Sequence, residues 1–156
     1  MLIIKRLTVN DIQLFKDTVI RFIYESTTNA KYVDSFVKAD AEQKFEELDN
    51  YLSEGKAMVY GAIEDNTLIG FVWAYEYPFR DNKSRIYVSI LHIDAQNRSR
   101  KIGQYLLSKI EEEATTLGYG SVFLHTESFN DGAIRFYNKM GYVPERIQLV
   151  KKQLTT

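Results

Sequence analysis

A basic turn between a hydrophobic strand and an amphipathic helix is the part of this chain best suited to chemistry. The segment Ile90–Leu107 reads ILHIDAQNRSRKIGQYLL, and its turn carries Arg98, Arg100 and Lys101. The first N–H groups of a helix have no partner within the helix, and the helix dipole is positive at that end. The pattern therefore predicts a site for a phosphorylated anion. The simpler interpretation is that the basic residues only solvate a turn.

Several ionisable side chains stand in or at the ends of expected strands and are candidates for a general base. Glu76 and Tyr77 end one strand, Glu127 follows another, and His92 and His125 lie within strands. Carboxylate and imidazole groups can take a proton from a reacting group. Surface glutamates and hydrogen-bonded strand histidines are the structural alternatives, so the residues alone leave the base open.

The composition predicts one globular domain over residues 1–156. The chain has 45% hydrophobic and 26% charged residues, which is enough apolar surface to offset chain entropy. Its net charge of −1 gives no positive field for phosphate backbones, so we expect no nucleic-acid partner. The chain has no cysteine, which excludes disulfides, thiolate metal sites and a cysteine nucleophile.

The sequence also predicts a soluble, cytoplasmic protein without a membrane partner. The first residues, MLIIKRLTVND, have a short apolar run before their charges and are typical of a first strand. No stretch approaches the roughly 18 apolar residues that a membrane span needs.

Hydrophobic periodicity predicts a mixed α/β (α+β) chain. The predicted strands are 2–7, 57–64, 68–77, 85–93 and 121–126, with one or two closing strands in 142–152. The predicted helices begin at Thr8 or Asn10, at Asp40, at Lys101, and at Asn130 or Asp131, with a partly helical connection over 24–38. The strand, helix and strand over 85–126 predict a parallel crossover.

Two segments resemble the signatures of the GNAT superfamily of N-acetyltransferases. The first signature is Arg or Gln, two residues, Gly, one residue, then Gly or Ala, and the chain is similar to it from Arg98 to Gly103. One position departs, because Lys101 stands where the family usually has glycine. The second segment is FLHTESFNDGAIRFYNKMGYVP. Its matching residues are Asn130, Ala133, Phe136, Tyr137, Gly141 and Tyr142.

The resemblance implies the GNAT fold, with acetyl-coenzyme A as cosubstrate. In that fold a mixed, mostly antiparallel twisted sheet carries about four helices, and strands four and five splay apart around the pantetheine arm. Glycine in the loop lets the backbone approach the pyrophosphate, and lysine keeps the N–H groups that bind it, so we expect the site to persist. The implied cofactor-binding residues are Leu91, His92, Ile93, Arg98, Ser99, Arg100, Lys101, Ile102, Gly103, Gln104, Asn130, Ala133, Phe136 and Tyr137.

The resemblance also implies how an acetyl group reaches a primary amine. The backbone N–H of Leu91 would bind the thioester carbonyl, and the hydroxyl of Tyr137 would protonate the departing thiolate. Glu76 and Glu127 are the weaker candidates for a base or for binding the ammonium. A core tyrosine and a simple helix cap are the structural alternatives for Tyr137 and Asn130. Without cysteine, direct attack in a ternary complex is favoured over an acyl-cysteine intermediate.

The acceptor is expected to be a small-molecule or peptide amine held by aromatic side chains. The segments that would form its wall contain Tyr24, Tyr32, Phe36, Tyr75, Tyr77 and Phe79. An exposed edge strand at Val143–Lys152 would suit a homodimer. We expect no metal, because the histidines have no third ligand at metal spacing. The alternative function is a non-catalytic acyl-CoA-sensing or protein-interaction domain of the same fold.

Overall fold

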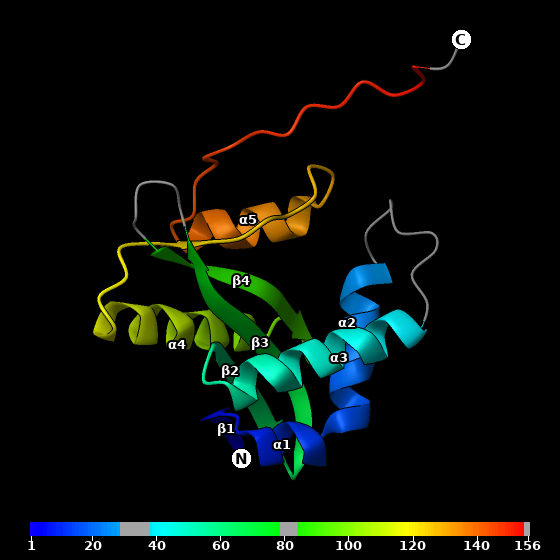
Figure 1. The fold of residues 1–156 in the computed structure, drawn as a ribbon, viewed down its shortest axis with the longest axis vertical. Helices are drawn as coiled ribbons and strands as arrows, with labels where there is room; N and C mark the ends of the chain where they lie inside the picture. The colour runs from blue at the N-terminus through cyan, green and yellow to red at the C-terminus, as the bar shows by residue number, and fades with distance from the viewer. Residues whose placement is uncertain (29–37, 79–83, 155–156) are drawn as a thin grey trace. The chain divides into compact units, whose positions relative to one another are not determined.

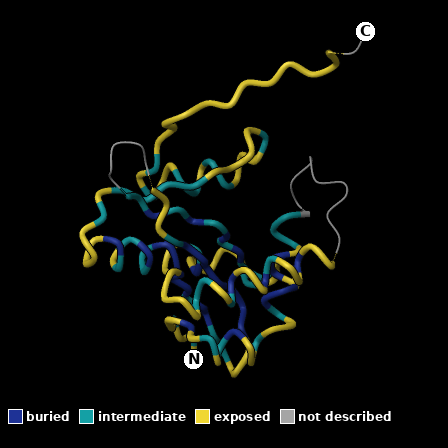
Figure 2. Tube along the Cα trace, in the orientation of Figure 1, coloured by how far each residue is buried: buried dark blue, intermediate teal, exposed yellow. Residues whose placement is uncertain are grey.

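The computed structural model describes residues 1–28, 38–78 and 84–154 (Figure 1). The chain forms two compact units, Met1–His125 and Thr126–Thr156. The first unit contains the sheet and most of the helices, and the second contains one helix and the C-terminal segment. Figure 2 shows that the buried residues gather in the strands and helices of the first unit.

The first unit opens with a strand and three helices. They are β1 (Leu2–Arg6), α1 (Val9–Leu14), α2 (Lys16–Thr28) and α3 (Lys38–Ser53). Thr8 caps α1, because its Oγ1 accepts from the N–H of Asp11 at 3.1 Å and the Asp11 carboxylate accepts from the N–H of Thr8 at 2.9 Å. The predicted cap is confirmed. The single helix expected after it is wrong, because the chain bends at Phe15 before α2 begins.

Five strands form one mixed sheet in the order β1-β2-β3-β4-β5. The remaining strands are β2 (Ala57–Glu64), β3 (Thr67–Pro78), β4 (Ser84–Ile93) and β5 (Val122–Phe123). Neighbours from β1 to β4 are antiparallel, and β4 and β5 are parallel. The helix α4 (Ile102–Thr116) makes the parallel connection, so the predicted crossover is confirmed. The turn at Asp65 and Asn66 has positive φ at both residues, as a tight hairpin requires.

Helices cover both faces of the sheet in the first unit. Residues 68–74 of β3 are buried without alternation, which is typical of a strand with packing on both sides. One buried cluster joins Phe71, Trp73 and Ile90 to apolar residues of α1, α2 and α3. The helix α4 packs against β2, β3 and β4 through its own buried stripe, which comprises Ile102, Leu106, Leu107, Ile110 and Ala114.

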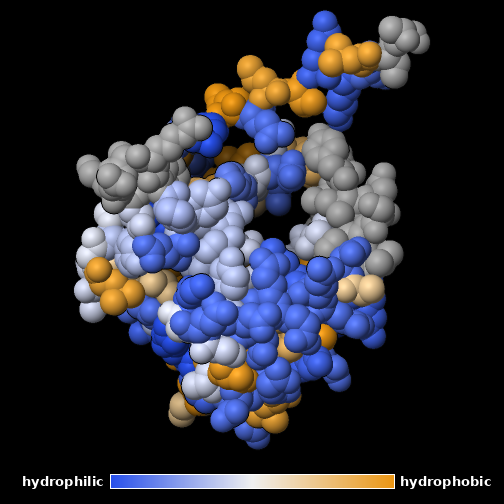
Figure 3. Space-filling model, in the orientation of Figure 1, coloured by the Kyte–Doolittle hydropathy of each residue, from blue (hydrophilic) through white to orange (hydrophobic). Residues whose placement is uncertain are grey.

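The second unit contains α5 (Asp131–Lys139), which begins after Asn130. The chain then turns at Gly141, where φ is 93°. Residues 142–154 form no strand, so the predicted closing strands and the edge strand at Val143–Lys152 are wrong. A strand needs a neighbouring strand to hydrogen-bond its N–H and C=O groups. The element described in the second unit is the helix α5, which cannot serve as that neighbour. Figure 3 shows hydrophobic side chains along this segment, which include the exposed Ile147, Leu149 and Leu154.

Candidate active site

The two parallel strands of the sheet run together only at their beginning. Their pairing ends at Tyr87 and Phe123, where β5 stops, whereas β4 continues to Ile93. In the described part of the sheet, the edge of Val88–Ile93 that faces away from β3 has no strand beside it. Such an edge offers N–H and C=O groups to an extended ligand. Residues 91–93, expected to pair with the pantetheine amides, lie on this open edge.

A β-bulge lies just before the expected thioester position. Between their paired positions β4 has one residue more than β3, and the extra residue is Ser89. A bulge bends the strand and reverses which side the later residues face. His92 therefore lies on the side of α2, and not on the side of Val88 as simple alternation predicts. Leu91 is two residues after the bulge, and its N–H is the group predicted to donate a hydrogen bond to the thioester carbonyl.

The N-terminus of α4 presents backbone N–H groups that have no internal acceptor. Lys101 is the N-cap residue, its side chain makes no capping hydrogen bond, and its φ of 63° is left-handed. The first backbone bond of the helix is from Tyr105 to the carbonyl of Lys101, at 3.1 Å. Among the described residues, the N–H groups of Ile102, Gly103 and Gln104 accordingly have no protein acceptor. A helix terminus of this kind suits an anion.

The basic side chains of the turn are only partly committed to the fold. Arg98 donates from Nε to the carbonyl oxygen of Ile93 at 3.3 Å. Arg100 is held more firmly, with two bonds to the Glu64 carboxylate at 3.0 and 2.7 Å and one to Asn97 at 2.8 Å. The ion pair lowers the pKa of Glu64 and raises that of Arg100. Arg100 therefore anchors the loop as well as adding charge to it.

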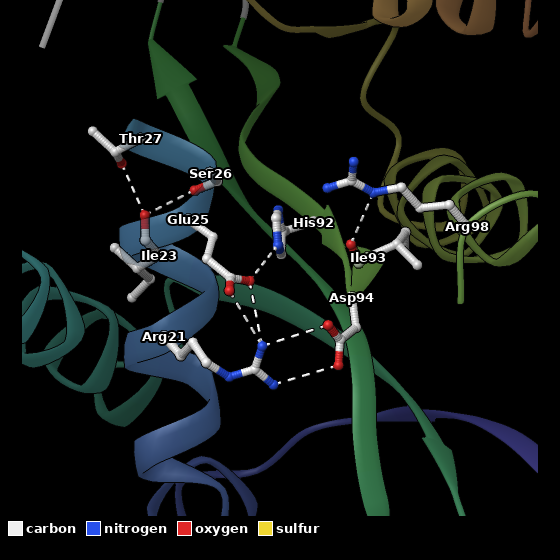
Figure 4. A network of polar contacts seen from close by, with 9 residues as sticks. All are labelled: Arg21, Ile23, Glu25, Ser26, Thr27, His92, Ile93, Asp94 and Arg98. Carbon is white, nitrogen blue, oxygen red and sulfur yellow. Dashed lines mark hydrogen bonds and ion pairs between the residues drawn. The ribbon is translucent and has the colours of Figure 1, made fainter. Parts of the chain in front are cut away.

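His92 is packed and hydrogen-bonded on the α2 side of the sheet (Figure 4). Its side chain is 6% exposed, its Nε2 lies 3.1 Å from Glu25, and its ring centroid lies 5.2 Å from that of Phe22. Burial lowers the pKa of His92 below its usual value, and the bond to Glu25 opposes that shift. Arg21 bridges Glu25 and Asp94, so α2 is tied to the end of β4.

The two glutamates proposed as weaker candidates lie in different surroundings. Glu76 alternates with Tyr77 along β3, so their side chains face opposite sides of the sheet. The ring of Tyr77 contacts that of Tyr87. Glu76 lies within hydrogen-bond reach of Tyr119. Burial raises the pKa of Tyr119, and the hydrogen bond to Glu76 raises it further. Glu127 is exposed and belongs to the second unit, where its carbonyl accepts from Asn130.

Sequence reasoning missed an aromatic shelf that crosses three strands on the α2 side. We define the aromatic shelf as Tyr75 and Tyr77 of β3, Tyr87 of β4 and Phe123 of β5. The Tyr87 centroid lies 5.5, 5.9 and 5.0 Å from those of Tyr75, Tyr77 and Phe123. At its end, His125 Nδ1 lies 3.3 Å from the Tyr87 hydroxyl. The sequence shows that Tyr75 and Tyr77 lie two residues apart and so face the same side of one strand. Only the pairing of β3 with β4 shows that Tyr87 lies beside them.

The remaining residues of the predicted acceptor wall are Tyr24, Tyr32, Phe36 and Phe79. Tyr32, Phe36 and Phe79 lie outside the described residues. Tyr24 lies on α2 and lines a groove between α2 and α3 together with Lys16 and Glu42.

The second unit carries the other predicted cofactor and catalytic residues. Asn130 is the N-cap of α5, with its side-chain oxygen accepting from the N–H of Ala133 at 3.1 Å, so the predicted helix cap is confirmed. The ring of Tyr137 lies 5.1 Å from that of Phe136 and 5.8 Å from that of Tyr142. Burial raises the pKa of Tyr137 to about 12. A phenol with this pKa is protonated at neutral pH and can act as a donor.

Two further properties concern the described residues alone. No group of three His, Asp or Glu side chains in 1–28, 38–78 and 84–154 is arranged to hold a metal ion. None of the helices in those ranges is long and apolar enough to cross a bilayer.

The sequence is similar to a family of acetyltransferases and to single proteins named as acetyltransferases. The profile of the Acetyltransferase (GNAT) family matches residues 23–142. The uncharacterized N-acetyltransferase YdgE of Bacillus subtilis (strain 168) is 31% identical over 86 residues, which are 55% of this chain and 54% of YdgE. Mycothiol acetyltransferase of Rhodococcus jostii (strain RHA1) is 29% identical over 91 residues, 56% of this chain and 29% of that protein. The match thus spans about half of one relative and under a third of the other.

Solved structures share the fold across almost the whole chain. A GCN5-related N-acetyltransferase from Ralstonia eutropha JMP134 superposes with a TM-score of 0.80 at 20% identity, covering 97% of this chain and 98% of its own. An aminoglycoside acetyltransferase from an uncultured soil metagenomic sample, in complex with trehalose, superposes at 0.74 with 24% identity, covering 99% and 97%. With the family profile matched over most of its length, the chain belongs to the GNAT family of acetyltransferases.

Proposed function

We propose that this protein transfers an acetyl group from acetyl-coenzyme A to a primary amine of a small molecule or peptide. The observation that carries the proposal is the open edge of β4, which is followed by a short 3-10 helix (Ala95–Asn97), a turn and the uncapped N-terminus of α4. An extended amide-containing arm and a pyrophosphate are the two parts of coenzyme A that such a strand and such a helix terminus suit.

The residues of this region fit the cofactor chemically. The backbone of Leu91–Ile93 can pair with the pantetheine amides, and the N–H groups of Ile102, Gly103 and Gln104 can receive the pyrophosphate. Lys101 already has the left-handed φ that the family glycine would adopt easily, so its backbone geometry is compatible with the loop. Arg98, Ser99 and Arg100 complete the polar lining of the turn.

The proposed reaction is a direct transfer in a ternary complex. The neutral amine nitrogen attacks the thioester carbonyl carbon, and the N–H of Leu91 stabilises the oxyanion that develops. The C–S bond then breaks, the coenzyme A thiolate takes a proton from the Tyr137 hydroxyl, and the nitrogen loses its extra proton to a base. The chain has no cysteine, so no acyl-cysteine can form on it.

The assignment of Tyr137, Asn130, Ala133 and Phe136 to the site follows from the resemblance of residues 123–144 to the second GNAT signature. We propose that residues 1–156 work as one N-acetyltransferase domain, since the family profile spans both compact units. Because acetyl-coenzyme A is a cytoplasmic metabolite, we place the protein in the cytoplasm.

The proposal is tested with purified protein, acetyl-coenzyme A and a panel of amines. The panel contains an aminoglycoside, spermidine, tyramine and a peptide with a free N-terminus. Release of free thiol together with an acetylated amine detected by mass spectrometry would support the proposal. Tight binding of coenzyme A without turnover of any amine would favour the sensing or interaction domain instead.

A further inference from the structure

The two histidines of the chain have opposite surroundings, although both lie on the α2 side of the sheet. His92 is buried against Phe22 and bonded to Glu25. His125 is exposed and follows β5 at the end of the aromatic shelf, with its Nδ1 3.3 Å from the hydroxyl of Tyr87. An exposed imidazole with one nitrogen oriented by a neighbour has its other nitrogen available for chemistry.

Tyr87 is suited to orient this imidazole. Burial, with a smaller effect of Tyr77, raises the pKa of Tyr87, so its phenol stays neutral at physiological pH. When Nδ1–H donates to the phenol oxygen, the lone pair of Nε2 is free to accept a proton. Among the described residues, Tyr77 and Arg85 contact the ring of Phe123, which contacts His125, and Glu127 follows two residues later.

His125 lies beside the point where the open edge begins. Pairing between β4 and β5 ends at Tyr87 and Phe123, and the ring centroid of His125 lies 5.4 Å from that of Tyr87. Leu91 is four residues beyond Tyr87, which is about 13 Å along a strand. The proton of an amine at a thioester held at Leu91 would therefore reach the imidazole through water.

Rings in the aromatic shelf and next to it already hold cations of the protein itself. The guanidinium carbon of Arg85 lies 4.9 Å from the centroid of Phe123, and Lys44 Nζ lies 5.3 Å from that of Trp73, which contacts Tyr75. These contacts show that the faces of this cluster suit positive charge. Tyr77, at the outer end of the shelf, is 45% exposed.

We propose that His125 is the general base of the transfer and that the aromatic shelf binds the acceptor as an ammonium attached to an aromatic or apolar body. This inference rests on the proposed function. His125 Nε2 takes one proton from the acceptor ammonium through water, and the amine that results attacks the thioester. The second nitrogen proton, released after the attack, restores the Tyr137 hydroxyl that has protonated the coenzyme A thiolate. Tyr87 acts on the reaction through His125 and is a positioning residue.

The test compares His125→Asn, Tyr87→Phe and the matched control His92→Asn, with tyramine as the acceptor and acetyl-coenzyme A saturating. We expect kcat/KM of the wild type to rise with pH to a plateau. In His125→Asn, kcat/KM should fall about a hundredfold or more and should no longer rise with pH on the acidic side, whereas His92→Asn should keep that rise. In Tyr87→Phe, kcat/KM should fall about tenfold, and its rise should move to a different pH. Spermidine, which has no ring, should be a poorer acceptor than tyramine.

A second measurement does not depend on turnover. The chain has two histidines, so the imidazole NMR signals are assigned with one variant. Tyramine added to the coenzyme A complex should shift the His125 signal and leave that of His92 in place. An unshifted His125 signal, or a His125→Asn variant with wild-type rates and profile, overturns the inference. Calorimetry with acetyl-coenzyme A separates the two proposals, because failure of the wild type to bind would refute the proposed function itself.

Discussion

The guanidinium of Arg100 donates two hydrogen bonds, of 3.0 and 2.7 Å, to the carboxylate of Glu64. The pair ties the turn before α4 to the end of β2, and it places a carboxylate at Arg100, two residues before the first of the N–H groups proposed to receive a pyrophosphate. The side chains of Arg100 and Glu64 are 40% and 28% exposed and thus reached by solvent, so the pair itself adds little to stability. Its effect on ligand charge is the larger consequence.

Glu64→Gln is therefore expected to tighten coenzyme A binding about threefold at low ionic strength, because a repulsive charge is removed and Arg100 is released. Calorimetric titration at low and high salt measures the gain, which should shrink as salt screens it. Glu54→Gln, which removes an exposed carboxylate paired with Lys56, is the control. Weaker binding by Glu64→Gln would mean that the ion pair is needed to hold the loop.

Lys101→Gly should stabilise the protein by up to about 1 kcal/mol, because a left-handed φ of 63° strains a lysine and not a glycine. The extra entropy of glycine in the unfolded chain offsets part of that gain. Urea denaturation gives the change in free energy of unfolding. Lys109→Gly, inside α4, should instead destabilise by about 1 kcal/mol. Equal losses at the two positions would refute the strain at Lys101.

Stability should depend on pH through His92. Burial lowers the pKa of His92 in the folded protein below the usual value of 6.5, so the unfolded chain takes up a proton first as pH falls. The free energy of unfolding should therefore decrease as pH drops below that value, down to the folded pKa. Urea denaturation across this range should show a shallower pH dependence for His92→Asn, with His125→Asn as the exposed control. Parallel curves for wild type and His92→Asn would contradict the prediction.

Tyr137→Phe should lower kcat by about ten- to a hundredfold while leaving the Kd for acetyl-coenzyme A nearly unchanged, since only the proton donor is removed. Because burial raises the pKa of Tyr137 to about 12, its phenol should cause no alkaline loss of activity below about pH 10. Steady-state rates over pH measure both effects, and Tyr142→Phe on the same short segment is the control. A Tyr137→Phe enzyme with full kcat would remove this residue from the mechanism.

Hydrophobic periodicity, turn residues and helix caps in the sequence predicted several elements of the fold. β2 has the bounds expected from alternation, and Asp65 and Asn66 form the expected hairpin turn. The apolar stripe of 102–116 and the Asn130 cap likewise gave α4 and α5 nearly to the residue.

Features that depend on distant partners could not be predicted in the same way. The extra residue at Ser89 exists only relative to β3, and it changes the side on which His92 lies. β5 ends at Phe123 because pairing with β4 stops there, although the apolar sequence continues. The contact between Tyr87 and His125 joins residues 38 positions apart, which no local pattern reveals.

The most direct test of the central claim is to follow backbone amide NMR signals of the protein while coenzyme A is added. If the cofactor lies along β4 and on α4, the amides of Leu91, Ile93, Ile102, Gly103 and Gln104 should shift most. Saturation of these shifts at one Kd would support a single continuous site. Shifts confined to the groove between α2 and α3, or no shifts at all, would contradict the account.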